Sequence, residues 1–346
     1  MTAGVRGWRV ALVAAGLCAG LTAAVGLLRL ARETRLDGAS LAGKLHQKRH
    51  LWRSVRARHW QIVSPAYESA SATDEREGTR GACGPGMVDV KGRMLMERES
   101  NPHAAGRIDL VQQSTCTEWI QREYPERCAQ FDRDAWLQKS EGFPRKDMHF
   151  CVDRFEYPNV VGQYPLIYVS WYEARELCDG LGKRLCTEDE WTFACEGEEG
   201  RPYPYGNGYA RDPEKCVTDE RWTAYNEKAM NPRDGELAGV EMDRLWRGKA
   251  AGSQPACKSP FGVYDLTGNV DEWTTSVREG ERPSILKGGY WGPVRTRCRP
   301  STRSHDQNHT FYQEGFRCCS DVGLVRTVRE TASPSPATAP LPRELE

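Results

Sequence analysis

Residues 261–273 read FGVYDLTGNVDEW, and the fold prediction rests first on this stretch. Its Gly-Asn turn at 268–269 is of a kind that exposes backbone carbonyls on one side. From residue 197 onward, Gly, Pro, aromatic residues and short strand-like runs dominate the chain, with little sign of helix. The abundance of Trp and Tyr there favours a loop-rich core that is assembled from large side chains.

Two helices are predicted upstream, and a capping box opens each of them. In Ser170-Trp-Tyr-Glu173 the serine hydroxyl caps a backbone N–H while the glutamate reaches back to the cap. The apolar residues that follow share one helical face: Ala174, Leu177, Cys178 and Leu181. Two glycines, Gly180 and Gly182, end the helix. Thr187-Glu-Asp-Glu190 repeats the device for a second helix, which Gly197 ends.

The segment before these helices predicts two strands with two short helices between them. Met87–Val90 alternates apolar and polar residues, and Phe150–Glu156 is the second strand candidate. The short helices are predicted around Thr117–Tyr124 and Asp132–Lys139.

Both ends of the chain are predicted to lie outside the folded domain. Residues 1–28 contain one long apolar run, which indicates a secretory signal peptide or a single membrane anchor. Residues 29–81 are polar and basic and predict a linker. Residues 325–346 form a Pro-rich tail that should be disordered. The folded domain is then 82–324.

Composition excludes several classes of protein. The chain has 346 residues, with 48 Lys+Arg against 48 Asp+Glu. Its net charge is therefore zero, which gives no support to a nucleic-acid-binding function. A mean hydropathy of −0.67 excludes a polytopic membrane protein. Of 13 cysteines, all but Cys18 lie after residue 80, and no CxxC pair occurs among them. That pattern favours disulfides in an oxidising compartment.

Several separated motifs resemble the formylglycine-generating enzyme, or sulfatase-modifying factor, family. They are GMVDV (86–90), PLIYVSWYEA (165–174), GKRLCTEDEW (182–191), YPYG (203–206), FGVYDLTGNVDEW (261–273), LKGG (286–289) and GFRC (315–318). The resemblance implies a single α+β domain with little regular secondary structure, related to C-type lectins. Family members connect the two opening strands over a short distance, so residues 92–148 are predicted to be an insertion.

The resemblance also implies a structural calcium site in the turn within residues 261–273. The family's ligand positions correspond to the side chains of Asp265 and Glu272 and the backbone carbonyls of Gly268 and Val270. Ca²⁺ takes six to eight hard oxygen ligands at flexible distances, which such a turn can supply. The alternative is that both acidic residues are ordinary turn and surface residues.

The cysteines are expected to form a frame of disulfides. The resemblance implies Cys178–Cys318 and Cys195–Cys298. Positions on either side of inserted loops favour Cys83–Cys151 and Cys216–Cys257, and Cys116 and Cys128 bracket a predicted helix that they could staple. Cys186 and Cys319 would then be left to each other. The vicinal Cys318-Cys319 could instead be a redox or metal site, but neighbours on a strand face opposite ways, which favours different partners.

The catalytic motif departs from the family. The enzymes carry GG-S-x-x-C-x4-C, whose two thiolates bind Cu(I) and activate O₂ to oxidise a substrate cysteine. Here Tyr290 replaces the serine and Pro293 replaces the first cysteine. Counting forward from Gly289 gives Cys298 the second cysteine position, whereas counting back from GFRC makes it the disulfide cysteine. In either case a two-thiolate copper site cannot be assembled, so copper is not expected.

A histidine pair is a second candidate metal site. His305 and His309, together with Asp306, could ligate zinc or iron. The alternative is that two histidines in a polar loop are solvated surface residues.

Two functions of different classes remain. The first is an exported, calcium-stabilised, non-catalytic module that binds a peptide or protein of the cell envelope. The second is a metal-dependent oxidoreductase with an altered active site. In both cases the protein is expected to be periplasmic or secreted, and bound to the membrane only if its N-terminal segment is uncleaved.

Overall fold

The computed structural model describes residues 51–55, 59–63, 83–97 and 107–323 except 234 and 279. The described residues belong to one compact unit. The predicted signal or anchor (1–28) and the predicted tail (325–346) lie outside them. Within the described part, no helix has the length and apolar character that crossing a membrane requires.

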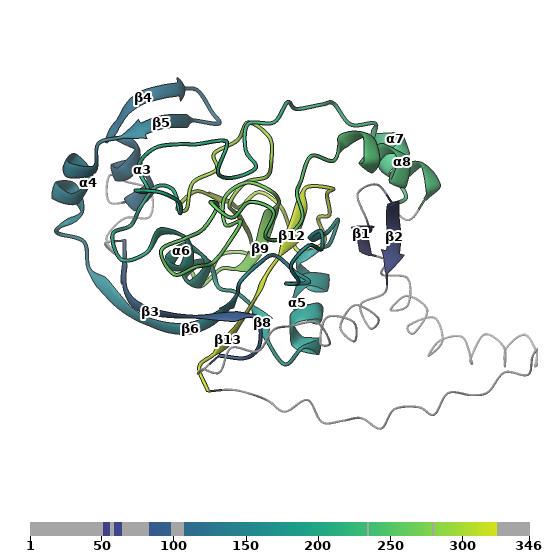
Figure 1. Ribbon diagram of the computed structural model, residues 1–346, viewed down its shortest axis with the longest axis horizontal. Coiled ribbons are helices and arrows are strands. Elements are labelled where there is room, and N and C mark those ends of the chain that lie inside the picture. The colour runs from purple at the N-terminus through teal and green to yellow at the C-terminus, as the bar shows by residue number, and fades with distance from the viewer. Residues whose placement is uncertain are drawn as a thin grey trace, which may run out of the picture. The chain divides into compact units, whose positions relative to one another are not determined.

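The first sheet joins the start and the end of the domain (Figure 1). Its strands, in spatial order, are β3 (Met87–Leu95), β6 (Arg145–Asp153), β13 (Cys318–Asp321) and β8 (Arg184–Leu185). Both predicted opening strands are confirmed. The antiparallel ladder of β3 and β6 runs from Met87↔Asp153 to Leu95↔Arg145, so it continues past the predicted insertion boundaries at 92 and 148. The excursion proper is therefore 96–144.

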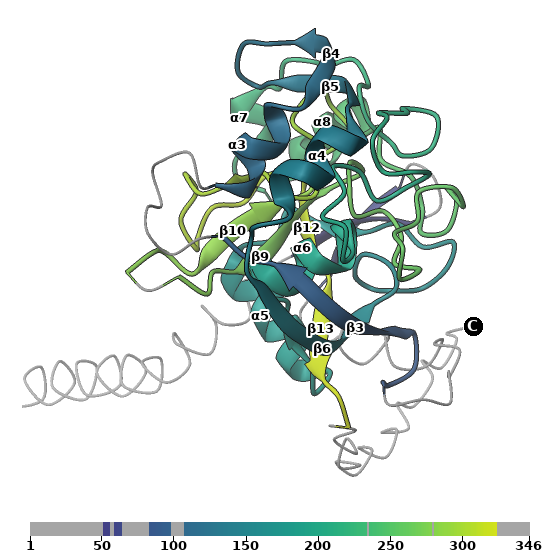
Figure 2. The same ribbon diagram turned by 90° about the vertical axis from the view of Figure 1, so that its left-hand side faces the viewer.

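This excursion carries its own small elements (Figure 2). They are α3 (Ile108–Gln113), β4 (Cys116–Gln121), β5 (Arg127–Phe131) and α4 (Arg133–Ser140). The helix predicted at Asp132–Lys139 is confirmed, with the Asp132 side chain accepting from the Ala135 N–H. The helix predicted at Thr117–Tyr124 is wrong. That segment pairs as β4 with β5, and its Thr, Trp and Ile suit a strand.

Both capping-box helices are confirmed. They are α5 (Trp171–Gly180), capped by Ser170 and Glu173, and α6 (Glu188–Glu196), capped by Thr187 and Glu190. Their apolar faces are buried in the core beside the two main sheets.

The second sheet is formed late in the chain. Its strands, in spatial order, are β11 (Ser301–Thr302), β10 (Ser284–Lys287), β9 (Asp271–Thr275) and β12 (Glu314–Phe316). β9 and β12 run parallel, which sets Glu314 beside Asp271 and Phe316 beside Trp273. The stretch quoted first thus leads directly into a central strand of this sheet.

Two features were not predicted. Helices α7 (Glu227–Met230) and α8 (Glu236–Leu245) occur where little helix was expected. Within the predicted linker, β1 (Leu51–Val55) and β2 (His59–Val63) form a hairpin, and β1 pairs with β7 (Leu166–Ile167).

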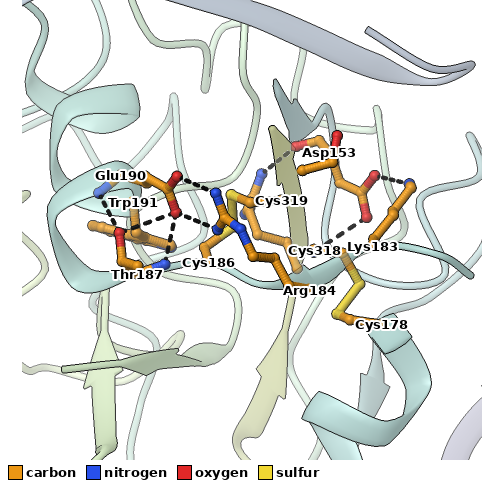
Figure 3. The surroundings of a disulfide bond; sticks show 12 residues. Asp153, Cys178, Lys183, Arg184, Cys186, Thr187, Glu190, Trp191, Cys318 and Cys319 are labelled. Carbon is orange, nitrogen blue, oxygen red and sulfur yellow. Dashed lines mark hydrogen bonds and ion pairs between the residues drawn. A yellow bond between two sulfur atoms is a disulfide. The ribbon is translucent and has the colours of Figure 1, made fainter. Parts of the chain in front are cut away.

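Six disulfides connect the elements, and they involve every cysteine of the described residues. The pairs are those that the sequence predicts: Cys83–Cys151, Cys116–Cys128, Cys178–Cys318, Cys186–Cys319, Cys195–Cys298 and Cys216–Cys257. Figure 3 shows the vicinal cysteines of β13 with their separate partners, one on α5 and one after β8. The strand is therefore tied on both of its faces.

Candidate functional site

A groove with a cavity volume of about 400 Å³ lies along the second sheet. We call it the groove. It is lined by Tyr124, Pro125, Tyr225, Asp271, Leu286, Gly288, Gly289, Tyr290, Val294, Arg295, Pro300, Ser301, Thr302, His305, His309, Phe311, Gln313 and Glu314. The excursion contributes one wall through Tyr124 and Pro125, and the other residues come from the second half of the chain.

The Gly-Gly pair after β10 shapes the groove. Gly288 and Gly289 have φ angles of 92° and 71°, which favour glycine. A Cβ atom on Gly288 would lie 2.8 Å from the carbonyl oxygen of Leu266, so no larger residue fits there. The chain then turns through Tyr290, which lines the groove at the position of the family's serine.

No thiol of the described residues faces the groove. Cys298 is fully buried and bonded to Cys195, and its N–H donates to the carbonyl of Pro202 at 3.0 Å. The second of the two ways of counting is therefore the correct one. Pro293 stands where the family's other catalytic cysteine would be.

Two carboxylates lie side by side in the groove, and the sequence did not single them out. Asp271 begins β9 and Glu314 begins β12, paired across the parallel ladder. The Gly289 N–H donates to Asp271 Oδ1 at 2.9 Å. Burial, reinforced by Glu314, raises the pKa of Asp271 to about 7. Burial also raises the pKa of Glu314, against the opposing effect of His309.

The two predicted histidines meet Glu314 rather than Asp306. His309 Nε2 lies 3.1 Å from Glu314 Oε1, and the rings of His305 and His309 stack with centroids 3.9 Å apart. Asp306 is not part of this group of possible ligands, and its carboxylate accepts from the backbone N–H groups of Asn308 and His309. The hydrogen bond that His309 donates to Glu314 raises the pKa of His309, whereas burial and His309 lower that of His305. One candidate ligand atom from each of the three residues lies within 4.8 Å of the others.

The predicted calcium turn lies on the other side of β9. Asp265 and Glu272 are both buried, so the surface alternative does not describe them. Arg317 donates to both oxygens of Glu272 at 2.6 Å, and the Trp191 indole N–H donates to Oε2 at 2.9 Å.

A third buried carboxylate, that of Glu156, shares this region with Asp265 and Glu272. The side-chain amide of Asn269 donates to Glu156 Oε2 at 2.5 Å. Burial raises the pKa of Asp265 to about 7, and burial, Asp265 and Glu272 raise that of Glu156. Three carboxylates thus surround one guanidinium, that of Arg317, and this surplus of buried negative charge fits an additional cation such as Ca²⁺.

Comparison with known proteins places the domain in context. Residues 112–322 match the family model described as a sulfatase-modifying factor enzyme 1-like domain. The inactive C-alpha-formylglycine-generating enzyme 2 of Bos taurus is 32% identical over 170 residues, covering 46% of this chain and 52% of that protein. The formylglycine-generating enzyme of Mus musculus is 27% identical over 191 residues, covering 46% of this chain and 44% of that protein.

The solved structure of PvdO from Pseudomonas aeruginosa is also similar. It covers 72% of this chain and 100% of its own, with 14% identity and a TM-score of 0.42. The chain spans about half the length of the curated relatives cited above.

Proposed function

Because the chain belongs to the sulfatase-modifying factor family, we propose that it is an extracytoplasmic binding module. It holds an extended peptide or protein segment of the cell envelope in the groove and does not oxidise cysteine with copper. The observation that carries this proposal is an open groove with no cysteine in its described lining, while Cys298, the remaining candidate for a catalytic thiol, is bonded to Cys195.

The chemistry of copper supports the non-catalytic part of the proposal. Cu(I) is a soft ion that selects thiolate ligands. The family's first catalytic cysteine is Pro293 here, and the remaining candidate is committed to a disulfide. A relative that is named inactive is compatible with such a role.

The lining of the groove supports binding of an extended segment. Four aromatic side chains, those of Tyr124, Tyr225, Tyr290 and Phe311, offer large apolar faces with polar handles on the tyrosines. β11 is an edge strand of its sheet and lines the groove through Ser301 and Thr302. Edge strands accept extended peptides through main-chain hydrogen bonds.

The disulfides support the proposed compartment. Six disulfides in one domain are typical of an oxidising, extracytoplasmic environment. Export by the segment 1–28, as a cleaved signal or a retained anchor, is part of the proposal.

Calcium is proposed to stabilise the fold at the turn. Asp265, Glu272 and the carbonyls of Gly268 and Val270 would hold it, and Arg317 would share Glu272 with the ion. The surplus of buried carboxylates supports this assignment. Bound calcium would neutralise that charge and tie the turn to β9.

A second candidate is a metal-dependent oxidoreductase with an altered active site. The cluster of His305, His309 and Glu314 in the groove favours it. Turnover of a bound peptide, rather than binding alone, would distinguish this enzyme from the module.

The test fills the groove in the exported full chain. Thr302→Trp places an indole on the edge strand, where an aromatic residue is tolerated. On an array of extended peptides, this variant should lose about tenfold or more in affinity. The matched control is Val161→Trp, at an exposed position outside the groove lining, and it should bind like the parent protein.

Two results would contradict the proposal. One is that no peptide binds the parent protein, or that both tryptophan variants bind equally. The other is oxidation of a cysteine-containing peptide when Cu(I) and O₂ are supplied, detected by mass spectrometry.

A further inference from the structure

Three side chains that ligate transition metals converge in the groove. His305 and His309 come from the loop after β11, and Glu314 is the first residue of β12. Candidate ligand atoms of the three lie within 4.8 Å of one another. Three ligand atoms in the tetrahedral geometry of zinc, at bond lengths of about 2.1 Å, lie about 3.4 Å apart, so the side chains must draw together by about 1 Å.

The carboxylate of Glu314 is left incompletely paired. Glu314 is 4% exposed, and the His309 ring contacts its Oε1. Within the part of the chain that the structure describes, the other oxygen, Oε2, is buried without a hydrogen-bond partner. A buried carboxylate oxygen without a donor is costly, and a metal ion or a proton removes that cost.

A second carboxylate lies beside Glu314, and the Arg295 guanidinium of the groove wall is the weakest of the influences on the pKa of that second carboxylate. Asp271 lies next to Glu314 across the strand pair, and its carboxylate accepts from the Gly289 N–H. The positive group in direct contact with Glu314 is the imidazole of His309, and only when that ring is protonated. A divalent cation here would therefore compensate charge that the protein leaves in place.

We propose that His305, His309 and Glu314 bind one divalent transition-metal ion, zinc or iron(II), in the groove. Two imidazoles and one carboxylate are the donor set of catalytic zinc sites and of non-haem iron sites. This set suits neither Ca²⁺, which takes oxygen ligands, nor Cu(I), which takes sulfur. To bind the ion together, the stacked rings of His305 and His309 would have to turn so that one nitrogen of each faces it.

The inference goes beyond the proposed function, because the ion binds whether or not a peptide occupies the groove. With an occupant present, the open positions would accept a carboxylate, imidazole or thiolate from it. A metal ion binds the neutral imidazole and the ionised carboxylate, so protons compete with it and the affinity rises with pH.

The experiment uses untagged, exported full-length protein that has been stripped with a chelator and returned to calcium. Zn²⁺ alone is titrated by calorimetry, and Co²⁺, whose visible absorption reports on its ligands, is used as a second probe. One equivalent should bind. His305→Ala and Glu314→Gln should each lower the Zn²⁺ affinity by about a hundredfold or more. Removing a residue that only hydrogen-bonds to a metal ligand typically costs about ten- to a hundredfold, so the loss of a ligand itself should be larger.

The matched control is His149→Ala. His149 is a partly exposed histidine that pairs with Asp89 at 3.0 Å outside the groove, so its loss should leave Zn²⁺ affinity unchanged. Near-ultraviolet circular dichroism and disulfide mapping verify folding, and His305→Ala decides alone if Glu314→Gln does not fold. No Zn²⁺ binding by the parent protein, or equal affinity in all variants, would overturn the proposal.

Discussion

Asp271 and Glu272 are neighbours on β9, and they differ in how the protein treats their charge. Alternate residues of a strand face opposite sides of the sheet. Glu272 faces the core, where Arg317 donates to both of its oxygens and Trp191 adds a third hydrogen bond. Asp271 faces the groove, beside a second carboxylate, that of Glu314.

The same division extends across the domain. On the core side, several buried charges are paired, as in Arg299 with Glu196 and Lys183 with Asp153, and the exception is the surplus of carboxylates around Arg317, where calcium is proposed to bind. On the groove side, the buried Oε2 of Glu314 has no hydrogen-bond partner among the described residues. Unpaired buried charge is destabilising, so its retention at these two places indicates binding of a cation rather than structural support. The core side fixes the fold, and the groove side is available for function.

The disulfide Cys195–Cys298 gives the strongest test of this division. It spans 103 residues, for which chain-entropy reasoning gives up to about 4.7 kcal/mol of stabilisation. The double variant Cys195→Ser with Cys298→Ser should therefore fail to accumulate on export. Cys116→Ser with Cys128→Ser opens a loop of only 12 residues and should lose less, about 3 kcal/mol or below.

Peptide mapping of unreduced protein after native alkylation accompanies the measurement of yield. A cross-linked peptide that contains both Cys195 and Cys298 would place Cys298 in the core. Quantitative alkylation of Cys298 in folded protein would move it to the groove side and reopen thiol chemistry there.

Removal of the core guanidinium comes next in size. Arg317→Met leaves Glu272 buried without its partner and should destabilise the domain by about 3–5 kcal/mol, measured by urea unfolding in chelator. Arg295→Met removes a guanidinium from the groove wall and should change stability far less. Adding Glu272→Leu to Arg317→Met should recover part of the loss, since it removes the stranded charge. Equal effects of the two arginine variants would erase the distinction between core and groove.

The sequence predicts much of the core side because its signals are local or are carried by cysteines. Ser170 with Glu173 and Thr187 with Glu190 lie three residues apart, within one turn of helix, so the helix starts can be read directly. By contrast, the N-cap residue of α8 is Gly235, which has no side chain to cap the helix, so the local signal is missing. β4 is a strand because β5 pairs with it, a condition that its own residues do not reveal.

The groove was harder to predict because its members meet through long-range pairing. Asp271 and Glu314 are brought together by the parallel register of β9 and β12, over more than forty residues of sequence. His305 and His309 were found, but the nearest acidic residue in sequence, Asp306, is not part of the group that they form with Glu314. The available signal was the position of Glu314 directly before the GFRC motif, on the strand beside the quoted turn.

Calcium offers an intermediate test on the core side of β9. Removing it with a calcium-selective chelator should lower the melting temperature without breaking the disulfide frame, because a ligand that binds only the native state stabilises it. At a hundredfold excess over Kd the stabilisation is about 2.7 kcal/mol. In Asp265→Ala the difference between calcium and chelator, measured by scanning calorimetry, should disappear.

Comparing calcium with chelator within each variant cancels the backbone strain of alanine at Asp265, whose φ is 58°. Asp212→Ala, a change outside the turn, should keep the full calcium effect. A calcium-dependent rise in melting temperature that persists in Asp265→Ala would place the ion elsewhere.

The smallest expected effect concerns Asp219, which joins the excursion to the rest of the domain. Asp219 accepts from Arg127 of β5 at 2.9 Å and from Arg211 at 2.6 and 2.8 Å. Burial alone would raise the pKa of Asp219, but the hydrogen bonds from Arg211 and Arg127 outweigh it and lower the pKa. β5 belongs to the same hairpin as the groove wall at Tyr124, so this ion pair supports the groove from the core side.

A carboxylate with a lowered pKa binds fewer protons in the folded state than in the unfolded state. Its contribution is therefore complete above the ordinary pKa of Asp, near 3.9, and is lost as the pH falls through the lowered value. Asp219→Asn should lower stability by roughly 1 kcal/mol at pH 7, and the difference from the parent protein should vanish in strong acid. Urea unfolding midpoints between pH 7 and pH 2 measure it, with Asp134→Asn, on the exposed side of α4, as the control. A stability difference that stays constant with pH would mean that the asparagine acts through its shape and not through the lost charge. The excursion would then be held by packing, and the groove wall would need no ion pair to support it.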